Sequence, residues 1–450
     1  MTSPYKPVET QSLPLKPEVL VLGGGITGIS IAQGLAKSGI RVALVEKEEK
    51  LGGRASELRR FYDRPEDVRK WIEEKISELA RTPQVSLMTQ SELKRLDGHM
   101  GRFQARVRRQ DSTETLLSPS AVVVATGCAT ERERSGLWAH KRVITLPEME
   151  KLLSETIDSN LLWDGKKVEW VTFLLDGVNE DMKVDSINAI KQSLILQETA
   201  HCQAAILCKD VKVAAHGMER LYRKARDKGV IFFKYDEAPK LSMSNGQIQV
   251  DVKDTAAVQK AEQWSVSILS DLLVIAEALI PLPETKDLAG VLGLHQGSRG
   301  FFMEDNPQLL RVRSNRRGIF VAGACRFPQE VSESLIEARA VVQEVTALLS
   351  KGTYLYDLAV AEVDPKKCAV CYTCPRLCPH SAITVEKYVE GNVYKPIGVE
   401  ETPLWGAARV DPVACYGCGI CVAECPAKAI TLRHLSDDQI YAQMGLTEQE

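Results

Sequence analysis

Two short runs near the end of the chain carry eight of its twelve cysteines. The first run reads CAVCYTCPRLCP and begins at Cys368, and the second reads CYGCGICVAECP and begins at Cys415. Both follow the spacing C-x₂-C-x₂-C-x₃-C-P. With this spacing, one short loop can wrap three corners of an iron–sulfur cube, and the fourth cysteine of each run reaches the other cube.

The same spacing is that of bacterial ferredoxins, and it predicts two [4Fe-4S] clusters. The predicted ligands are Cys368, Cys371, Cys374 and Cys425 for cluster 1, and Cys415, Cys418, Cys421 and Cys378 for cluster 2. Structural zinc is the alternative, but zinc ribbons separate two CxxC pairs by a long spacer. The segments HSAITV and AKAITL follow the two runs and predict short strands. Each cysteine run with its strand is therefore one half of a domain that has an internal two-fold repeat.

Length and composition bound the rest of the chain. At 450 residues it predicts two or three domains, and 44% hydrophobic with 26% charged residues is typical of a folded protein. A net charge of -3 disfavours nucleic-acid binding. No apolar run reaches the roughly 18 residues of a membrane span. The polar, proline-rich start has no apolar signal region, so we expect a cytoplasmic protein with reduced thiols.

A nucleotide-binding motif opens the folded part. Residues 18–22 (EVLVL) predict a buried strand, and the pattern GxGxxG of Gly23, Gly25 and Gly28 follows at once and leads into a helix. In this motif the first glycine allows a tight turn, the second lets a pyrophosphate approach the backbone, and the third lets helix and strand pack closely. The next strand ends at Glu46, whose carboxylate can accept the ribose hydroxyls. The adjacent residues Ile26, Thr27 and Lys47 are also expected to contact the ligand.

Three later segments decide between FAD and NAD. The first, EKEEKLGGR, resembles the second glycine-rich signature of flavoproteins of the glutathione and thioredoxin reductase superfamily. The second, LSPSAVVVATG, resembles the strand that closes the first half of their FAD domain. The third, RRGIFVAGACRFPQEV, resembles their last FAD segment. Most members carry Gly-Asp at the turn of that last segment, whereas this chain carries Gly-Ala-Cys. The resemblance implies FAD contacts at Gly52, Gly53, Arg54, Ala125, Thr126, Gly127, Gly323 and Ala324.

The loss of Gly-Asp narrows the resemblance. The chain resembles the A-type subunit of heterodisulfide reductase, in which Gly-Asp is likewise lost. The resemblance is carried by the run GFFMEDNPQLLRVRSNRRGIFVAGACRFPQEVSESLIEARA and by the ferredoxin-like tail that follows it. This resemblance covers residues 18 to about 443. It implies an FAD that passes electrons through iron–sulfur clusters to partner subunits, which are B- or C-like subunits or hydrogenase- or dehydrogenase-linked carriers. It also implies a homodimer within a larger complex.

One position of the family pattern differs here. Electron-bifurcating members of the family that the chain resembles carry a Pro-Lys-Asp-like sequence after the glycine turn, whereas this chain carries Pro328-Gln329-Glu330. A lysine could stabilise a negative flavin through its charge, but a neutral glutamine can only form hydrogen bonds. The resemblance therefore leaves open whether the flavin of this chain bifurcates electrons. No side chain is assigned as catalytic, and Gln329, with Val331, is the candidate for the flavin neighbourhood.

The middle of the chain alternates strand-like and helical stretches, which predicts a second α/β domain where a thioredoxin reductase would bind NADPH. Its first strand is followed by DGVNEDMKVDS, without GxGxxG, and the domain has no CxxC dithiol. Cys202 and Cys208 are interpreted as packing residues. Cys128 and Cys325 are interpreted as small apolar residues beside the flavin, with a redox role as the less favoured alternative.

The predicted fold class is α/β: a two-domain, Rossmann-type FAD flavoprotein like thioredoxin reductase, with a C-terminal α+β domain like bacterial ferredoxin. The predicted domains are a flexible tail (1–17), the FAD domain (18–146 and 284–352), an inserted α/β domain (147–283), the ferredoxin domain (353–435) and a C-terminal tail (436–450). The linker 386–410, with Tyr394 and Trp405, is a docking loop or a plain surface insertion. Alternatives to the electron-transfer subunit are a stand-alone NAD(P)H:ferredoxin-type oxidoreductase and a scaffold with a silent flavin.

Overall fold

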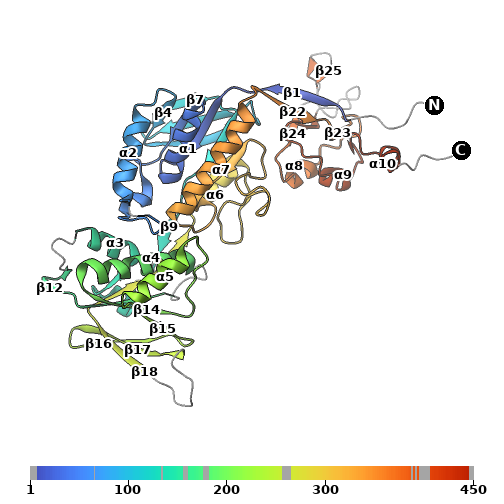
Figure 1. The fold of residues 1–450 in the computed structure, drawn as a ribbon. Coiled ribbons are helices and arrows are strands. Elements are labelled where there is room, and N and C mark those ends of the chain that lie inside the picture. The colour runs from blue at the N-terminus through green and yellow to red at the C-terminus, as the bar shows by residue number, and fades with distance from the viewer. Residues whose placement is uncertain are drawn as a thin grey trace.

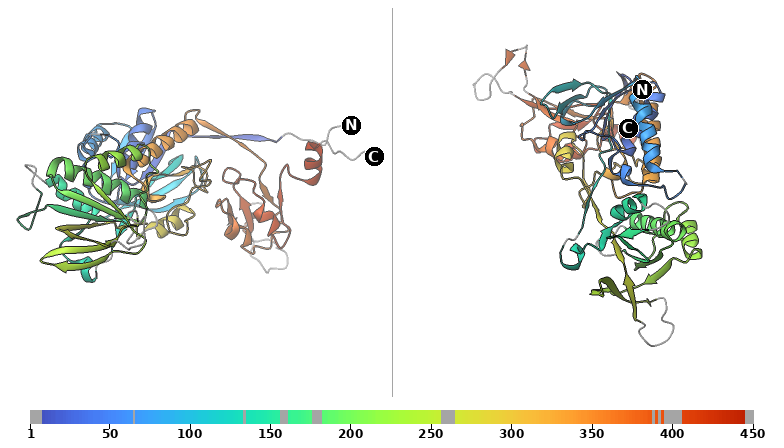
Figure 2. Two further views of the ribbon diagram at one scale, coloured as in Figure 1. Left: turned by 60° about the horizontal axis from the view of Figure 1, so that its bottom comes forward. Right: turned by 90° about the vertical axis from the view of Figure 1, so that its left-hand side faces the viewer.

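The computed structural model describes residues 8–64, 66–132, 135–155, 161–175, 182–255, 265–386, 389–390, 393–394 and 406–444. They form three bodies, which Figure 1 shows as a nucleotide-binding domain at the top, a middle domain below it and a ferredoxin-like domain to the right. Figure 2 shows the ferredoxin-like domain as a separate lobe beside the nucleotide-binding domain. No helix of the described part of the chain is long and apolar enough to cross a membrane.

The nucleotide-binding domain is built on a five-stranded parallel sheet of order β21-β8-β2-β3-β4. Its strands are β2 (Glu18–Leu22), β3 (Arg41–Val45), β4 (Val85–Met88), β8 (Ala121–Val124) and β21 (Ile319–Val321). The central strands are continuous apolar runs because both faces of a parallel sheet are covered. Since β21 comes from much later in the chain, the domain consists of two separate chain segments.

Helices cover this sheet. They are α1 (Ile26–Lys37), α2 (Val68–Ala80), α6 (Thr285–Leu292) and α7 (Val331–Leu349), with short 3₁₀ turns η1 (Gly53–Glu57) and η5 (Gly323–Cys325). α1 and α7 lie side by side in Figure 1, and a side chain on Gly34 would come within 2.6 Å of Val342. A small antiparallel sheet, β5 (Ser91–Asp97), β6 (Gln104–Arg109) and β7 (Glu114–Leu117), completes the domain.

The middle domain has its own five-stranded parallel sheet, of order β10-β19-β13-β14-β15. The strands are β10 (Val143–Thr145), β13 (Trp170–Leu174), β14 (Gln203–Cys208), β15 (Ile231–Lys234) and β19 (Leu272–Ile275). Its helical elements are α3 (Leu146–Glu155), α4 (Met182–Ile195), η3 (Leu196–Ala200) and α5 (Met218–Asp227), with η2 (Gly136–Ala139) just before β10. Two antiparallel units complete the domain. One is a sheet of β16 (Lys240–Ser244), β17 (Gln247–Lys253) and β18 (Ser265–Ser270), and the other is a hairpin of β11 (Leu162–Trp163) and β12 (Lys166–Lys167).

The start of this domain differs from the predicted boundary at residue 147. β10 already pairs with β19 of the middle sheet, so the domain includes Val143. The strand is only three residues long and carries no periodicity that a sequence reading could detect. Two connecting strands, β9 (Ala129–Glu131) and β20 (Ala278–Ile280), pair with each other where the chain leaves and re-enters the nucleotide-binding domain.

The N-terminal segment is not wholly the flexible tail that was expected. β1 (Thr10–Pro14) pairs antiparallel with β22 (Thr353–Asp357), which lies between α7 and the ferredoxin-like domain. Only Leu13 of β1 is buried, so the segment lacks the alternation that marks a strand. At the other end, α10 (Asp437–Gln443) is a helix within the predicted tail 436–450.

The ferredoxin-like domain repeats one unit twice. Its strands form two antiparallel pairs, β23 (Ala361–Val363) with β28 (Ile430–Leu432) and β24 (Ile383–Glu386) with β27 (Ala407–Val410). The short helices α8 (Thr373–Leu377) and α9 (Ile420–Ala423) pack beside them (Figure 1). β24 and β28 lie where the two repeated segments predicted short strands. In the linker, β25 (Val389–Glu390) pairs with β26 (Val393–Tyr394), and Trp405 lies outside the described residues.

Candidate functional site

A cavity of about 850 Å³ lies between the nucleotide-binding domain and the middle domain. A volume of this size is typical of a cofactor site. Of the predicted flavin contacts, only Gly28 and Gly323 are not part of its lining. Segments far apart in the sequence therefore meet around one space, as a nucleotide site of two chain segments requires.

The three glycines of GxGxxG have distinct surroundings. A side chain on Gly25, the residue before α1, would meet nothing within 4 Å, so the backbone there borders open space. A side chain on Gly28 would lie 1.8 Å from the carbonyl oxygen of Gly23, so Gly28 serves packing. Gly23 has a φ of 106° and abuts the backbone of Ala125. This arrangement leaves the N-terminus of α1 accessible to a phosphate group.

Glu46 stands at the end of β3, beside the first glycine loop. Its Oε2 accepts a hydrogen bond from the backbone N–H of Gly24 at 2.6 Å, and its Oε1 accepts one from the backbone N–H of Glu48 at 2.8 Å. These two bonds fix the carboxylate at the wall of the cavity. Each carboxylate oxygen has a second lone pair, so the group can also accept from ribose hydroxyls.

The second glycine loop packs directly on the first. The N–H of Gly52 donates to the carbonyl of Gly24 at 2.8 Å, and a side chain on Gly53 would lie 3.2 Å from the Cα atom of Gly25. Arg54 follows, and its Nη1 lies 3.1 Å from the Sγ of Cys128 in the cavity wall. The guanidinium of this exposed residue therefore contacts the wall of the site.

The two cysteines beside the cavity are buried thiols. Burial raises the pKa of Cys128, and the Arg54 charge opposes that rise only in part. Burial likewise raises the pKa of Cys325 to about 12, with the Glu337 charge adding to the effect. Only the thiolate is a strong nucleophile, so neither residue has the surroundings of a reactive cysteine.

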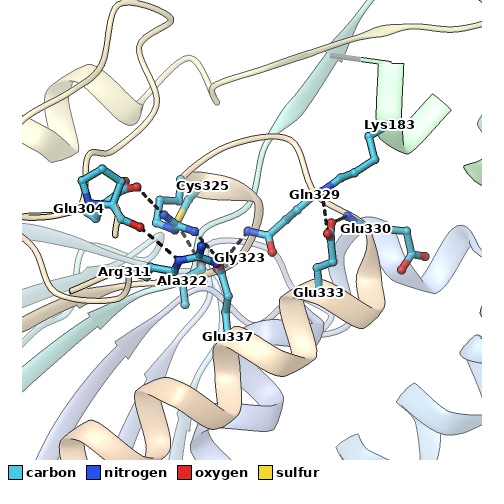
Figure 3. A network of polar contacts seen from close by, with 12 residues as sticks. Lys183, Glu304, Arg311, Ala322, Gly323, Cys325, Gln329, Glu330, Glu333 and Glu337 are labelled. Carbon is cyan, nitrogen blue, oxygen red and sulfur yellow. Dashed lines mark hydrogen bonds and ion pairs between the residues drawn. The ribbon is translucent and has the colours of Figure 1, made fainter. Parts of the chain in front are cut away.

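A buried ionic network supports the glycine turn that has lost its aspartate (Figure 3). The Glu337 carboxylate of α7 accepts hydrogen bonds from the N–H of Gly323 at 2.9 Å and from Nε2 of Gln329 at 3.1 Å. Arg326 pairs with Glu337 and, at 2.8 Å, with Glu304. Sequence reasoning missed Glu337 and Arg326, because an acid supplied by the following helix leaves no contiguous motif.

The middle domain contributes residues that the sequence did not indicate. Val184, Asn188 and Gln192 of α4 line the cavity. An ion pair between Lys183 Nζ and Glu333 Oε1, at 2.6 Å, joins this helix to the start of α7. The ion pair depends on tertiary structure. The only local signal is the spacing of Val184, Asn188 and Gln192, which are four residues apart and therefore share one face of α4.

The cysteines of the two runs gather in two small pockets. One is lined by Cys378, Cys415, Cys418 and Cys421, and the other by Cys368, Cys371, Cys374 and Cys425. The structure thus brings the fourth cysteine of each run to the first three of the other. Backbone N–H groups donate to three of the sulfurs: Ala382 to Cys378, Gly417 to Cys415 and Ala429 to Cys425.

The ferredoxin-like domain meets the nucleotide-binding domain on the Cys378 and Cys415 side. Asn315 Nδ2 donates to the carbonyl of Pro379 at 2.6 Å, and Arg317 Nη1 donates to that of Val413 at 2.7 Å. His99 Nε2 lies 2.9 Å from Asp411 Oδ2 across the same interface. Burial opposes protonation of His99, but the hydrogen bond and charge of Asp411 outweigh it, so the pKa of His99 is raised.

Comparisons with known proteins agree with this architecture. Residues 21–70 match the NAD(P)-binding Rossmann-like domain, and residues 367–430 match the 4Fe-4S dicluster domain. The solved thioredoxin reductase of Lactococcus lactis superimposes with a TM-score of 0.51, at 16% identity over 74% of this chain and 99% of that one. The chain thus has a thioredoxin-reductase-like, Rossmann-type fold of two dinucleotide-binding-type domains, extended by a C-terminal 4Fe-4S ferredoxin-like domain.

Curated relatives narrow the class further. The A-type iron–sulfur subunit of the CoB–CoM heterodisulfide reductase of Methanocaldococcus jannaschii is 26% identical over 82% of this chain and 70% of its own length. The A-type subunit of the H₂/formate:CoB-CoM heterodisulfide,ferredoxin reductase of Methanococcus maripaludis is 24% identical over 82% and 70%. The chain is thus similar over most of its length to A-type subunits of heterodisulfide reductases, which are oxidoreductases.

Proposed function

We propose that the chain is an FAD- and iron–sulfur-dependent electron-transfer subunit of a cytoplasmic, heterodisulfide-reductase-like complex. The observation that carries the proposal is the presence of two kinds of redox site in one chain. A cavity of about 850 Å³ collects the predicted flavin contacts, and two pockets each collect four thiols. A protein with both can exchange electrons with one partner and pass them to another.

The lining of the cavity fits FAD residue by residue. The first glycine loop and the N-terminus of α1 would bind the pyrophosphate, and Glu46 would accept from the ribose. Ala324 stands where the usual aspartate is lost, so the ribityl chain would gain no carboxylate there. A bound flavin would supply the chemistry of exchanging electrons in pairs or singly. The chain's own residues bind and orient it.

The two thiol pockets fit two [4Fe-4S] clusters better than zinc. Among the described residues, no group of three or more His, Cys, Asp and Glu side chains is arranged to hold a single metal ion. Each pocket is lined by four cysteines, three from one run and one from the other, which is the ligand arrangement of a two-cluster ferredoxin. Cys425 would complete the first cluster and Cys378 the second. Loss of any one ligand should remove one cluster.

The electron donor and acceptor would both bind to partner subunits. The middle domain lacks a nicotinamide fingerprint and a CxxC dithiol. B- or C-like subunits and hydrogenase- or dehydrogenase-linked carriers are the partners we infer, with a homodimer of this chain inside the complex. Anaerobic isolation of the native complex, with identification of the co-purified subunits and the molar mass, tests this inference.

A stand-alone NAD(P)H:ferredoxin-type oxidoreductase is the second candidate. The observation that favours it is the parallel sheet of the middle domain, which has the architecture of a dinucleotide-binding unit.

Cofactor analysis of the reconstituted chain should give one FAD and about eight iron atoms per chain. A chain with zinc and no iron, or with no flavin, would contradict the first proposal, and rapid reduction of the flavin by NADH or NADPH would favour the second candidate.

A further inference from the structure

Several hydrogen-bond acceptors in the cavity wall have no partner in the protein. Among the described residues, buried side-chain atoms without a partner include Oδ1 of Asn188, Oε1 of Gln192 and Oε1 of Gln329. All three residues line the cavity. Gln192 and Gln329 are only 1% and 7% exposed. Leaving a buried acceptor unpaired is costly, so three of them around one cavity point to a ligand with donor groups.

The orientation of each amide is set by its nitrogen. Nε2 of Gln329 donates to Glu337, and Nε2 of Gln192 donates to the carbonyl of Leu146 at 2.9 Å and to Glu150 at 3.0 Å. Nδ2 of Asn188 donates to the carbonyl of Val184 at 3.1 Å. Because these partners only accept, a flipped amide would lose its bonds. The free atom in each case is the carbonyl oxygen, and the set can only accept.

Each of the two carboxylates that accept from the glutamines has a cationic partner. Glu337 pairs with Arg326, which is 6% exposed. Glu150 lies 3.1 Å from Lys191 Nζ. Burial would raise the pKa of Glu150, but the Lys191 charge and hydrogen bonds from Arg59 and Gln192 outweigh it and lower that pKa. Nε2 of each glutamine therefore stays directed at its carboxylate, and the Oε1 atom stays directed at the cavity.

The acceptors come from two domains that are tied together at this place. The Lys183–Glu333 pair joins α4, which carries Asn188 and Gln192, to the start of α7, two residues after Gln329 (Figure 3). Lys183 also lies over the ring of Phe327, 5.9 Å from its centroid. Acceptors from both domains thus line the region of the cavity where the middle domain meets the nucleotide-binding domain.

We propose that Asn188, Gln192 and Gln329 form an acceptor set for the N–H groups of the flavin ring, so that this region holds the ring and favours its reduced form. The inference rests on the proposed function. An oxidised flavin ring offers one N–H group, at N3, and uptake of two electrons and one proton adds another at N5. The electrons come from the reductant and the proton from solvent. Acceptors that cannot donate should stabilise the form with more N–H groups.

The test compares midpoint potentials of the flavin in full-length, FAD- and cluster-loaded protein. Gln329→Met and Asn188→Leu each remove one acceptor, from different domains. Thr346→Val is the matched control, because Oγ1 of Thr346 is also buried without a partner but does not line the cavity. Samples are equilibrated with indicator dyes during enzymatic reduction, and the clusters are followed separately by EPR.

The acceptor of the N5–H group bonds only the reduced ring, so we expect its removal to shift the flavin potential downwards, with the ratio of reduced to oxidised flavin at a fixed potential falling about fivefold. The acceptor of the N3–H group bonds both forms, so its removal should weaken FAD binding and leave the potential unchanged. At least one of the two cavity variants should therefore lower the potential. The Thr346 variant should leave it unchanged. If both cavity variants bind FAD with an unchanged potential, the acceptor set is wrong. Weakened FAD binding in both variants without a change in potential in either would assign the oxygens to the ribityl hydroxyls and also overturn it. A wild-type chain that binds no FAD would overturn the proposed function itself.

Discussion

Arg326 is the residue whose replacement should most clearly test the buried network behind the glycine turn. Its side chain is 4% exposed and lies between the carboxylates of Glu337 and Glu304, which are 15% and 18% exposed. Arg326→Met keeps the apolar stem but removes the positive charge. Two carboxylates with little access to water then remain without their cation.

The expected cost follows from that burial. Removing one partner of a buried ion pair typically costs about 3–5 kcal/mol, because the remaining charge is left uncompensated, so we expect about 3 kcal/mol here. For a unit of roughly 200 residues this corresponds to a fall of about 6–12 °C in the melting temperature. Differential scanning calorimetry of the apo chain would measure it in the transition of the nucleotide-binding domain.

Two further variants make the reasoning refutable. Arg313→Met is the matched control, because Arg313 pairs with Glu344 on the surface, where the side chains are 49% and 36% exposed, and its loss should cost less than about 1 kcal/mol. Adding Glu337→Gln to Arg326→Met removes one of the stranded charges and should recover part of the lost stability. If Arg326→Met were no more harmful than Arg313→Met, the network would not contribute as described.

The remaining predictions concern the glycine loop, the thiol pockets and the domain interface. Gly25→Ala should keep the melting temperature within about 1 °C of wild type but weaken FAD binding at least tenfold in a fluorescence titration. Gly28→Ala should instead lower the melting temperature, because the alanine side chain would meet the backbone of Gly23. Cys378→Ser and Cys421→Ser should each leave about four iron atoms per chain and spare the same EPR signal, since both residues line one pocket; loss of different signals would refute the ligand exchange. The contribution of His99 to stability should be full below its ordinary pKa of 6.5 and be lost as the pH rises through its raised pKa, so the difference in melting temperature between wild type and His99→Gln should shrink towards zero in alkaline buffer.

The parts of the fold that the sequence predicted are those with local patterns. The run EVLVL followed by GxGxxG specifies strand, turn and helix within about twenty residues, and β2 and α1 form there. The cysteine spacing likewise predicts which thiols meet, because the ligand rule depends on spacing alone. These features need no knowledge of the remainder of the chain.

The parts that were not predicted depend on partners far apart in the sequence. β1 pairs with β22, more than 330 residues later in the chain, and β1 lacks the alternating burial that β22 shows. Glu337 takes its role from Gly323, Arg326 and Gln329 only once α7 folds back on the turn. The cavity wall on α4 follows from how two domains pack, which a linear motif does not encode.

The central claim is that electrons enter and leave this chain through partner subunits, with one flavin and two clusters between them. Anaerobic stopped-flow mixing of the fully loaded chain with NADH or NADPH tests it most directly, with dithionite as the positive control. The account predicts that dithionite reduces the flavin and both clusters, while neither nicotinamide bleaches the flavin on the timescale of seconds. Rapid bleaching by either nucleotide, followed by the appearance of reduced clusters, would contradict it.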